Sequence, residues 1–312
     1  MTGLIFSKAG LEYSKMAHAA NLSEHDFITI NALSELKDEH KSTIFWLLAE
    51  PSLALQVLPE LPNLRWLQST WAGVESLMTP AARRDYELTN IKGIFAPLMR
   101  EYVLAHCLAF ERHILAHHAA KLERRWLNDS NGVIRGKTML IMGVGSIGAG
   151  IAEAARFMGM RVLGVVNNPR QIESIDEVGS FNDLPHLLPQ ADYVVNVLPN
   201  TPTTHNLVDA HFLSHMKPTA LFINVGRGQA VVEADLATAL HNGIIAAAVL
   251  DVYQVEPLPE NHVFWDTPNL TLTSHTAAPS FPNEVFDIFI ENYRRFKRGE
   301  ALIYSVDFEK GY

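Results

Sequence analysis

The most regular feature of the chain is a series of short, almost uniformly apolar runs between positions 138 and 275. Stretches with helix-like spacing separate most of these runs. Strands with one solvated face alternate apolar and polar residues, whereas strands of a parallel sheet covered on both faces need not. The pattern therefore predicts an α/β domain built on a doubly wound parallel sheet. The runs are TMLIMGVG, RVLGVVN, ADYVVNVLP, TALFINVG, IIAAAVLDV and LTLTSH.

The first third of the chain has apolar runs of its own, punctuated by prolines. We expect strands at GLIFS, 42–49 (STIFWLLA), 64–70 (LRWLQST) and 91–96 (IKGIFA), with helical stretches between them. This pattern indicates a second, smaller α/β unit of about 100 residues. Residues 98–123 have helical spacing and predict one long helix joining the two parts, and 283–300 predicts a final helix. The tail after it can return to the first unit.

Composition narrows the class of protein. With 312 residues, of which 48% are apolar, the chain has enough material for two cores, and 19% charged residues argue against disorder. A net charge of -9 disfavours a nucleic-acid partner. A single cysteine, Cys107, excludes internal disulfides and thiolate metal clusters. Neither a signal peptide nor a membrane-spanning run is evident, so we expect a cytoplasmic protein without a membrane partner.

Gly143, Gly145 and Gly148 form a G-x-G-x-x-G sequence after the run that begins at Thr138 and before a helical stretch. In dinucleotide-binding folds these glycines serve a tight turn, close approach of the backbone to a pyrophosphate, and close packing of helix on strand. The helix N-terminus then faces the phosphates. A glycine-rich turn that binds nothing is the alternative, but the flanking strands favour a dinucleotide site.

The region after the second run reads GVVNNPRQ and contains no carboxylate. NAD-binding units usually place Asp or Glu there, about 20 residues after the glycines, to hold the ribose hydroxyls. Asn167 and Asn168 are neutral, and Arg170 would attract a 2′-phosphate. This favours NADP(H). If Arg170 points to solvent, NAD(H) is accepted as well.

Arg227, Glu256 and His275 each follow a predicted strand of the larger domain. Carboxyl ends of parallel strands meet at one edge of the sheet, where doubly wound folds bind ligands. Burying an arginine is costly unless an anion meets it, and the fork of a guanidinium fits a carboxylate. Histidine can protonate an alkoxide near neutral pH, and an adjacent carboxylate stabilises the imidazolium. The set suits hydride transfer to a 2-keto acid.

The chain resembles the D-isomer-specific 2-hydroxyacid dehydrogenases over essentially its whole length. The matching stretches are GVGSIG, LPNTPTT, INVGRGQAVVEADL, LDVYQVEPLP and TSHTAA. The chain looks most like the glyoxylate/hydroxypyruvate reductase A branch. The resemblance implies a Rossmann nucleotide domain, residues 98–282, inserted into a flavodoxin-like substrate domain formed by 1–97 and 283–312. It also implies a homodimer formed through the nucleotide domain.

The resemblance further implies roles for individual residues. Arg227 would bind the substrate, His275 would be the acid/base and Glu256 its partner. In the loop STWAGVE, the amides of Ala72 and Gly73 would meet the substrate carboxylate. Trp71 departs from the family, because some relatives have a smaller residue there, and we expect it to line or narrow the pocket with Trp46 and Met99. The expected cofactor contacts are Gly143, Gly145, Ser146, Ile147, Gly148, Asn167, Asn168, Arg170, Leu198, Pro199, Thr203, Val225, Gly226 and, near the nicotinamide amide, Asp251.

Simpler roles stay open for several of these residues. Arg227 could cap a helix or pair with Glu233, and His275 could lie in a turn without chemistry. His113 and His117 have the spacing of a metal pair but lack H-E-x-x-H, so we expect surface or interface residues and no metal. For the whole chain, the alternative to an enzyme is a non-catalytic, dinucleotide-sensing protein like the corepressors of this superfamily.

Overall fold

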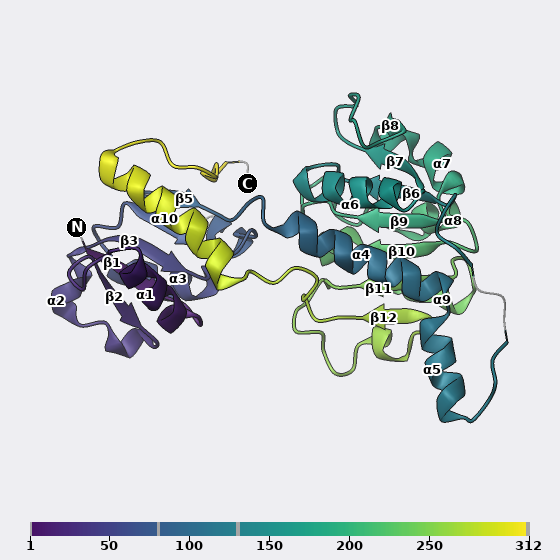
Figure 1. Cartoon of the computed structure of the whole chain (residues 1–312), viewed down its shortest axis with the longest axis horizontal. Helices are drawn as coiled ribbons and strands as arrows, with labels where there is room; N and C mark the ends of the chain where they lie inside the picture. Colours follow the sequence, from purple (N-terminus) through teal and green to yellow (C-terminus); the bar gives the residue numbers. More distant parts are fainter. Residues whose placement is uncertain (1, 80–81, 129–131, 310–312) are drawn as a thin grey trace. The chain divides into compact units, whose positions relative to one another are not determined.

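The computed structural model describes residues 2–79, 82–128 and 132–309. The chain forms two compact units, Met1–Ile94 with Ser280–Tyr312, and Phe95–Pro279 (Figure 1). The first unit is therefore discontinuous, and its boundaries lie close to those expected after residues 97 and 282. Among the described helices, none is both long enough and apolar enough to cross a bilayer. Cytoplasmic localisation stays a prediction.

The first unit is built on a five-stranded parallel sheet with the order β2-β1-β3-β4-β5. This is the flavodoxin-like strand order. The tail after the last helix returns to the sheet, because the amide of Val306 bonds the carbonyl of Leu88. The elements are β1 (Thr2–Phe6), α1 (Gly10–Ala19), β2 (Phe27–Ile30), α2 (Asp38–Lys41), β3 (Ile44–Ala49), α3 (Pro51–Val57), β4 (Trp66–Ser69), β5 (Glu87–Thr89) and α10 (Pro282–Arg298).

Trp46 belongs to the core of this unit, which corrects its assignment to the substrate pocket. Its side chain has 0% exposed surface and lies between the sheet and α10. Ring centroids of Trp46 and Phe289 are 5.2 Å apart, and Trp66 stacks on Phe289 at 5.6 Å. A side chain enclosed by aromatic rings on the sheet's own covering helix has no surface to offer a ligand.

Two predictions around residues 91–123 are wrong. No strand forms at 91–96: the edge strand is β5, the backbone turns at Gly93 with φ 89°, and α4 (Phe95–Glu111) begins two residues later. The single long helix is two helices, α4 and α5 (Ile114–Leu122), separated at His113, whose φ of 51° is left-handed. Apolar spacing continues across this break, so the sequence pattern did not reveal it.

The second unit is built on a seven-stranded parallel sheet with the order β12-β11-β10-β9-β6-β7-β8. Figure 1 shows α4 and α6 crossing the face of this sheet. The strands are β6 (Thr138–Met142), β7 (Arg161–Val165), β8 (Glu177–Gly179), β9 (Tyr193–Asn196), β10 (Leu221–Asn224), β11 (Ala247–Leu250) and β12 (Leu270–Leu272). The helices besides α4 and α5 are α6 (Ser146–Phe157), α7 (Leu184–Leu187), α8 (Ala210–Ser214) and α9 (Glu233–His241).

Both faces of this sheet are buried, as the apolar runs predicted. Met139 and Ile141 point into a core shared with α4 and α6, and Leu140 and Met142 point into a second core shared with α7, α8 and α9. Successive residues of one strand thus enter opposite cores, which is why the run is apolar throughout. With every strand parallel, all carboxyl ends lie along one edge of the sheet.

Candidate active site

The glycine loop joins β6, which lies between β9 and β7, to α6 at this carboxyl edge. Gly143 has φ 97°, a conformation that other residues rarely adopt. A Cβ at Gly148 would lie 2.2 Å from the carbonyl oxygen of Gly143, so α6 packs against the turn at a distance that only glycine permits. Gly145 is exposed at the N-terminus of α6, and a Cβ there would meet no described atom within 4 Å.

The other expected cofactor positions lie on loops at the same edge. Asn167, Asn168 and Arg170 are exposed in the turn after β7, and the first carboxylate after that strand is Glu173. Leu198, Pro199 and Thr203 follow β9, and Val225 and Gly226 follow β10. The fold thus places these candidates, which are far apart in sequence, along one edge on either side of the glycine loop.

The two glycines around Arg227 are required by close contacts on both sides of the turn after β10. A Cβ at Gly226 would lie 2.7 Å from the carbonyl oxygen of Leu198, in the loop after β9. A Cβ at Gly228 would lie 1.9 Å from the carbonyl carbon of Tyr253, in the loop after β11. The turn is therefore wedged between its two neighbouring loops, and this fixes the backbone from which the guanidinium projects.

Two buried asparagines, at the carboxyl ends of β9 and β10, also hold the turn that carries Arg227. Asn196 Nδ2 donates to Asn224 Oδ1 at 2.9 Å, and that oxygen also accepts the amide of Gly226 at 3.1 Å. Asn224 Nδ2 donates to the carbonyl of Arg227 at 3.1 Å. The guanidinium of Arg227 donates to the carbonyl of Gly226 at 2.9 Å.

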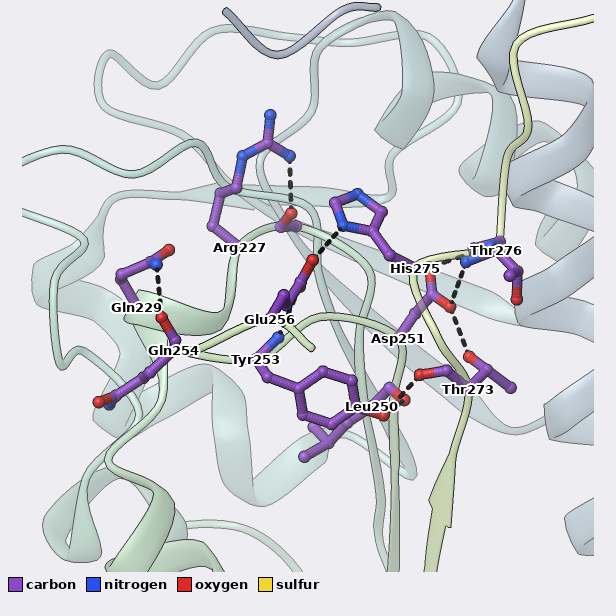
Figure 2. Close-up of polar contacts among 12 residues, drawn as sticks. Arg227, Gln229, Leu250, Asp251, Tyr253, Gln254, Glu256, Thr273, His275 and Thr276 are labelled. Atoms are coloured by element: carbon purple, nitrogen blue, oxygen red, sulfur yellow. Dashed lines mark hydrogen bonds and ion pairs between the residues drawn. The ribbon is translucent and has the colours of Figure 1, made fainter. Parts of the chain in front are cut away.

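His275 and Glu256 form a hydrogen-bonded pair. Nδ1 of His275, after β12, lies 2.7 Å from Oε2 of Glu256, after β11. The other carboxylate oxygen accepts the amide of Tyr253 at 3.0 Å, which fixes the carboxylate in place. In Figure 2 the imidazole, the carboxylate and the guanidinium of Arg227 gather in one region above the sheet edge. The three side chains come from loops after three neighbouring strands, β12, β11 and β10.

Residues 104–277 match the family model for the NAD binding domain of the D-isomer specific 2-hydroxyacid dehydrogenases. The chain belongs to this family. It is therefore an NAD(P)-dependent oxidoreductase with a dehydrogenase fold. The match covers the glycine loop and all three candidate catalytic residues.

Relatives support the same assignment over nearly the whole length of the dehydrogenase. Glyoxylate/hydroxypyruvate reductase A of Photorhabdus laumondii is 33% identical over 268 residues, covering 82% of this chain and 84% of the relative. A D-isomer specific 2-hydroxyacid dehydrogenase family protein from Aeromonas salmonicida superimposes with a TM-score of 0.94 and 40% identity, covering 98% of this chain and 99% of the other. An NADPH-dependent glyoxylate/hydroxypyruvate reductase from Sinorhizobium meliloti, solved with NADP and sulfate, gives a TM-score of 0.87 at 28% identity over 100% of both chains.

The pair shifts both pKa values in the dehydrogenase toward the charged forms. The hydrogen bond that His275 donates to Glu256 raises the pKa of His275, and this outweighs the opposing effects of burial and of the Arg227 charge. Burial raises the pKa of Glu256, but the hydrogen bonds from His275 and the Tyr253 amide, with the nearby charges of His275 and Arg227, bring it below its ordinary value. Each group of the pair thereby stabilises the charged form of the other.

Asp251 holds the turn that carries His275. Its carboxylate accepts the hydroxyl of Thr273, the amide of Thr276 at 2.8 Å and the amide of Ala277 at 2.9 Å, and its carbonyl accepts the amide of His275 at 2.8 Å (Figure 2). His275 itself adopts φ 54°, a left-handed conformation that needs such support. The sequence reading gave Asp251 only a nicotinamide contact, which stays a prediction. The sequence signal for its role in holding the His275 turn was the position of this carboxylate, directly after a buried strand.

The candidate substrate loop after β4 is also held by side chains. Ser69 Oγ exchanges hydrogen bonds with the backbone of Trp71, and Asn90 Nδ2 donates to the carbonyl of Ala72 at 2.8 Å. Trp71 is 47% exposed, and Gly73 is partly exposed. Met99, on α4, is partly buried and packs against the α4–α6 core of the second unit.

Glu233 and Cys107, which lie outside the pair of His275 and Glu256, have the following surroundings. Glu233 bonds Nε2 of His262 at 3.1 Å and the amide of Gln254 at 3.1 Å, which ties α9 to the loop that carries Glu256. Burial raises the pKa of the Cys107 thiol, which lies in the core and is therefore unreactive. In the part of the chain that the structure describes, no three acidic, histidine or cysteine side chains are grouped to hold a metal ion.

Proposed function

We propose that this dehydrogenase reduces small 2-keto acids of the glyoxylate or hydroxypyruvate type with NADPH. The observation that carries the proposal is the 2.7 Å pair of His275 and Glu256, placed at the same sheet edge as Arg227 and the glycine loop. A proton donor, its charge partner and a carboxylate-binding cation are what reduction of a 2-keto acid needs from a protein.

His275 is the proton donor in this proposal. Its Nδ1 is engaged by Glu256, so Nε2 delivers the proton to the carbonyl oxygen as negative charge develops there. Arg227 binds the substrate carboxylate and polarises the carbonyl group, which lowers the barrier by electrostatic stabilisation. When bound, the nicotinamide supplies the hydride to the carbonyl carbon. In the reverse direction, neutral His275 accepts the proton of the hydroxyl group.

The residues at the edge fit NADP(H). The exposed amide region around Gly145 and Ser146 at the start of α6 suits a pyrophosphate, since the helix dipole and backbone N–H groups attract anions. Arg170 and the two asparagines after β7 suit a 2′-phosphate, and no carboxylate stands there to repel it. The Sinorhizobium meliloti relative was solved with NADP. Ile147, Leu198, Pro199, Thr203, Val225, Gly226 and Asp251 complete the proposed cofactor site.

The proposed substrate contacts outside this edge are the amides of Ala72 and Gly73, with Trp71 limiting the size of the substrate. Trp71 is large and partly exposed, and the loop beneath it is fixed by Ser69 and Asn90. A bulky ring on a loop held by these hydrogen bonds favours a keto acid with a short chain.

A homodimer formed through the nucleotide unit is also proposed. The residues around α5 expose apolar side chains that a monomer would leave in water, among them Leu115 at 65%, Leu122 at 72% and Trp126 at 92%. Sedimentation equilibrium of the wild type and of Leu115→Glu tests this. A dimeric mass that falls toward 34.8 kDa in the variant is expected. A monomeric wild type would contradict it.

The test of function is consumption of NADPH with a panel of 2-keto acids, for the wild type and His275→Ala. We expect turnover with glyoxylate or hydroxypyruvate, and a loss of roughly 10²–10⁴-fold in kcat for the variant while NADPH still binds, because general acid catalysis contributes about that much. Tight NADPH binding by the wild type without turnover of any keto acid would instead support a dinucleotide-sensing protein.

A further inference from the structure

A chain of hydroxyl groups connects α4 to the turn that carries His275. The hydroxyl of Tyr102 lies 2.7 Å from Thr273 Oγ1, and Thr273 Oγ1 donates to the carboxylate of Asp251. Tyr102 is on α4 and the other two residues follow β12 and β11, so the chain spans three elements of one unit.

The direction of these hydrogen bonds follows from which groups carry a proton to donate. A carboxylate only accepts, so Thr273 must use its single hydroxyl proton on Asp251. Tyr102 is then the donor to Thr273. Burial raises the pKa of Tyr102 to about 12, which keeps the phenol protonated and able to donate. The phenol is thus the fixed start of a chain that ends on the Asp251 carboxylate.

That carboxylate is what holds the His275 turn. Asp251 accepts the amides of Thr276 and Ala277, the two residues after His275, while the left-handed φ of His275 makes the turn unfavourable without support. If Asp251 rotates, both amides lose their acceptor together. The hydroxyl of Thr273 donates to Oδ1, the same oxygen that accepts the amide of Thr276, and so also limits this rotation.

We propose that Tyr102 is a positioning residue for His275, acting through Thr273 and Asp251. In this proposal Tyr102 contacts neither the substrate nor the cofactor. Its hydroxyl orients the Asp251 carboxylate, which fixes the turn from which the imidazole reaches Glu256. The consequence for catalysis rests on the proposed role of His275, whereas the effect on the turn does not depend on activity.

The test uses Tyr102→Phe, Thr273→Val and Thr273→Ser. Tyr102→Phe keeps the ring, Thr273→Val keeps the branched shape without the hydroxyl, and Thr273→Ser keeps the hydroxyl. Hydrogen–deuterium exchange of 275–277 without substrate should quicken about fivefold in Tyr102→Phe and Thr273→Val, the equivalent of about 1 kcal/mol for one hydrogen bond. Their kcat should fall about fivefold with an unchanged KM for the keto acid, and Thr273→Ser should stay near the wild type.

Tyr86→Phe is the matched control, because Tyr86 is buried in the other unit and its hydroxyl has no hydrogen-bond partner among the described residues. It should change neither exchange nor kcat. The double variant Tyr102→Phe/Thr273→Val should lose little more activity and exchange protection than either single variant, since both substitutions break the same chain of hydrogen bonds. Unchanged exchange in both single variants, or a loss in Thr273→Ser equal to that in Thr273→Val, would overturn the proposal. If the wild type turns over no keto acid, the proposed function fails, and the exchange experiment still decides the role of Tyr102.

Discussion

Oε2 of Glu256 lies 2.7 Å from Nδ1 of His275, while Oε1 of the same carboxylate accepts the backbone amide of Tyr253. Glu256 is therefore fixed at one oxygen by its own loop and uses the other to orient the imidazole. In the proposed mechanism, the opposite ring nitrogen, Nε2, is the atom that exchanges a proton with substrate. Orientation and charge stabilisation come from one residue, and the two effects can be separated by substitution.

Glu256→Gln keeps the size of the side chain and removes its charge. The hydrogen bond with Glu256 is the largest cause of the raised pKa of His275, so this pKa should fall in the variant. Reduction needs the protonated imidazole, so the loss of activity at alkaline pH should begin at a lower pH. The variant should be slower at neutral pH and closer to the wild type in acid. The pH dependence of kcat/KM for reduction checks this, and a profile unchanged from the wild type would contradict it.

Arg227→Lys separates a planar fork from a point charge. A lysine keeps the positive charge but cannot bind a carboxylate through two parallel N–H donors. Loss of one charge-assisted hydrogen bond, worth about 1.5–3 kcal/mol, should lower kcat/KM by roughly 10–100-fold. NADPH affinity should change little. Steady-state kinetics with glyoxylate would decide, and wild-type parameters in the variant would remove the carboxylate fork from the mechanism.

The strands and the edge of the second unit were predictable because short apolar runs separated by helical stretches are typical of a parallel sheet covered on both faces. The helix break at His113 was not predictable, because apolar spacing continues across it. Trp46 was misplaced for a different reason: which face of β3 is covered depends on α10, more than 200 positions later in the chain. The supporting role of Asp251 was not predictable from its position in the sequence alone, because it depends on how the 273–277 turn folds back over its carboxylate.

Gly145→Ala and Gly228→Ala should fail in different ways. A Cβ at Gly228 would collide with the backbone of Tyr253, so this variant should lose about 1–3 kcal/mol of stability and disturb Arg227. A Cβ at Gly145 meets no described atom within 4 Å, so Gly145→Ala should fold with a melting temperature near that of the wild type. Its NADPH affinity should fall, because the methyl group would occupy the side from which the pyrophosphate approaches. Thermal unfolding and NADPH titration of both variants test the contrast, and undiminished binding by Gly145→Ala would place the phosphates elsewhere.

Arg170→Ala should reduce the preference for NADPH over NADH. The guanidinium is exposed in the turn after β7, beside Asn167 and Asn168, and a charge-assisted hydrogen bond to a 2′-phosphate is worth about 1.5–3 kcal/mol. The ratio of kcat/KM for the two cofactors should therefore fall by roughly tenfold or more, through a raised KM for NADPH with little change for NADH. Arg135→Ala is the control: Arg135 is also exposed but precedes β6, at the amino end of the strands, so it should leave the ratio unchanged. Equal ratios in the wild type and Arg170→Ala would show that the arginine points to solvent. Asn167 and Asn168, with no carboxylate before Glu173, would then be the proposed basis for accepting the 2′-phosphate.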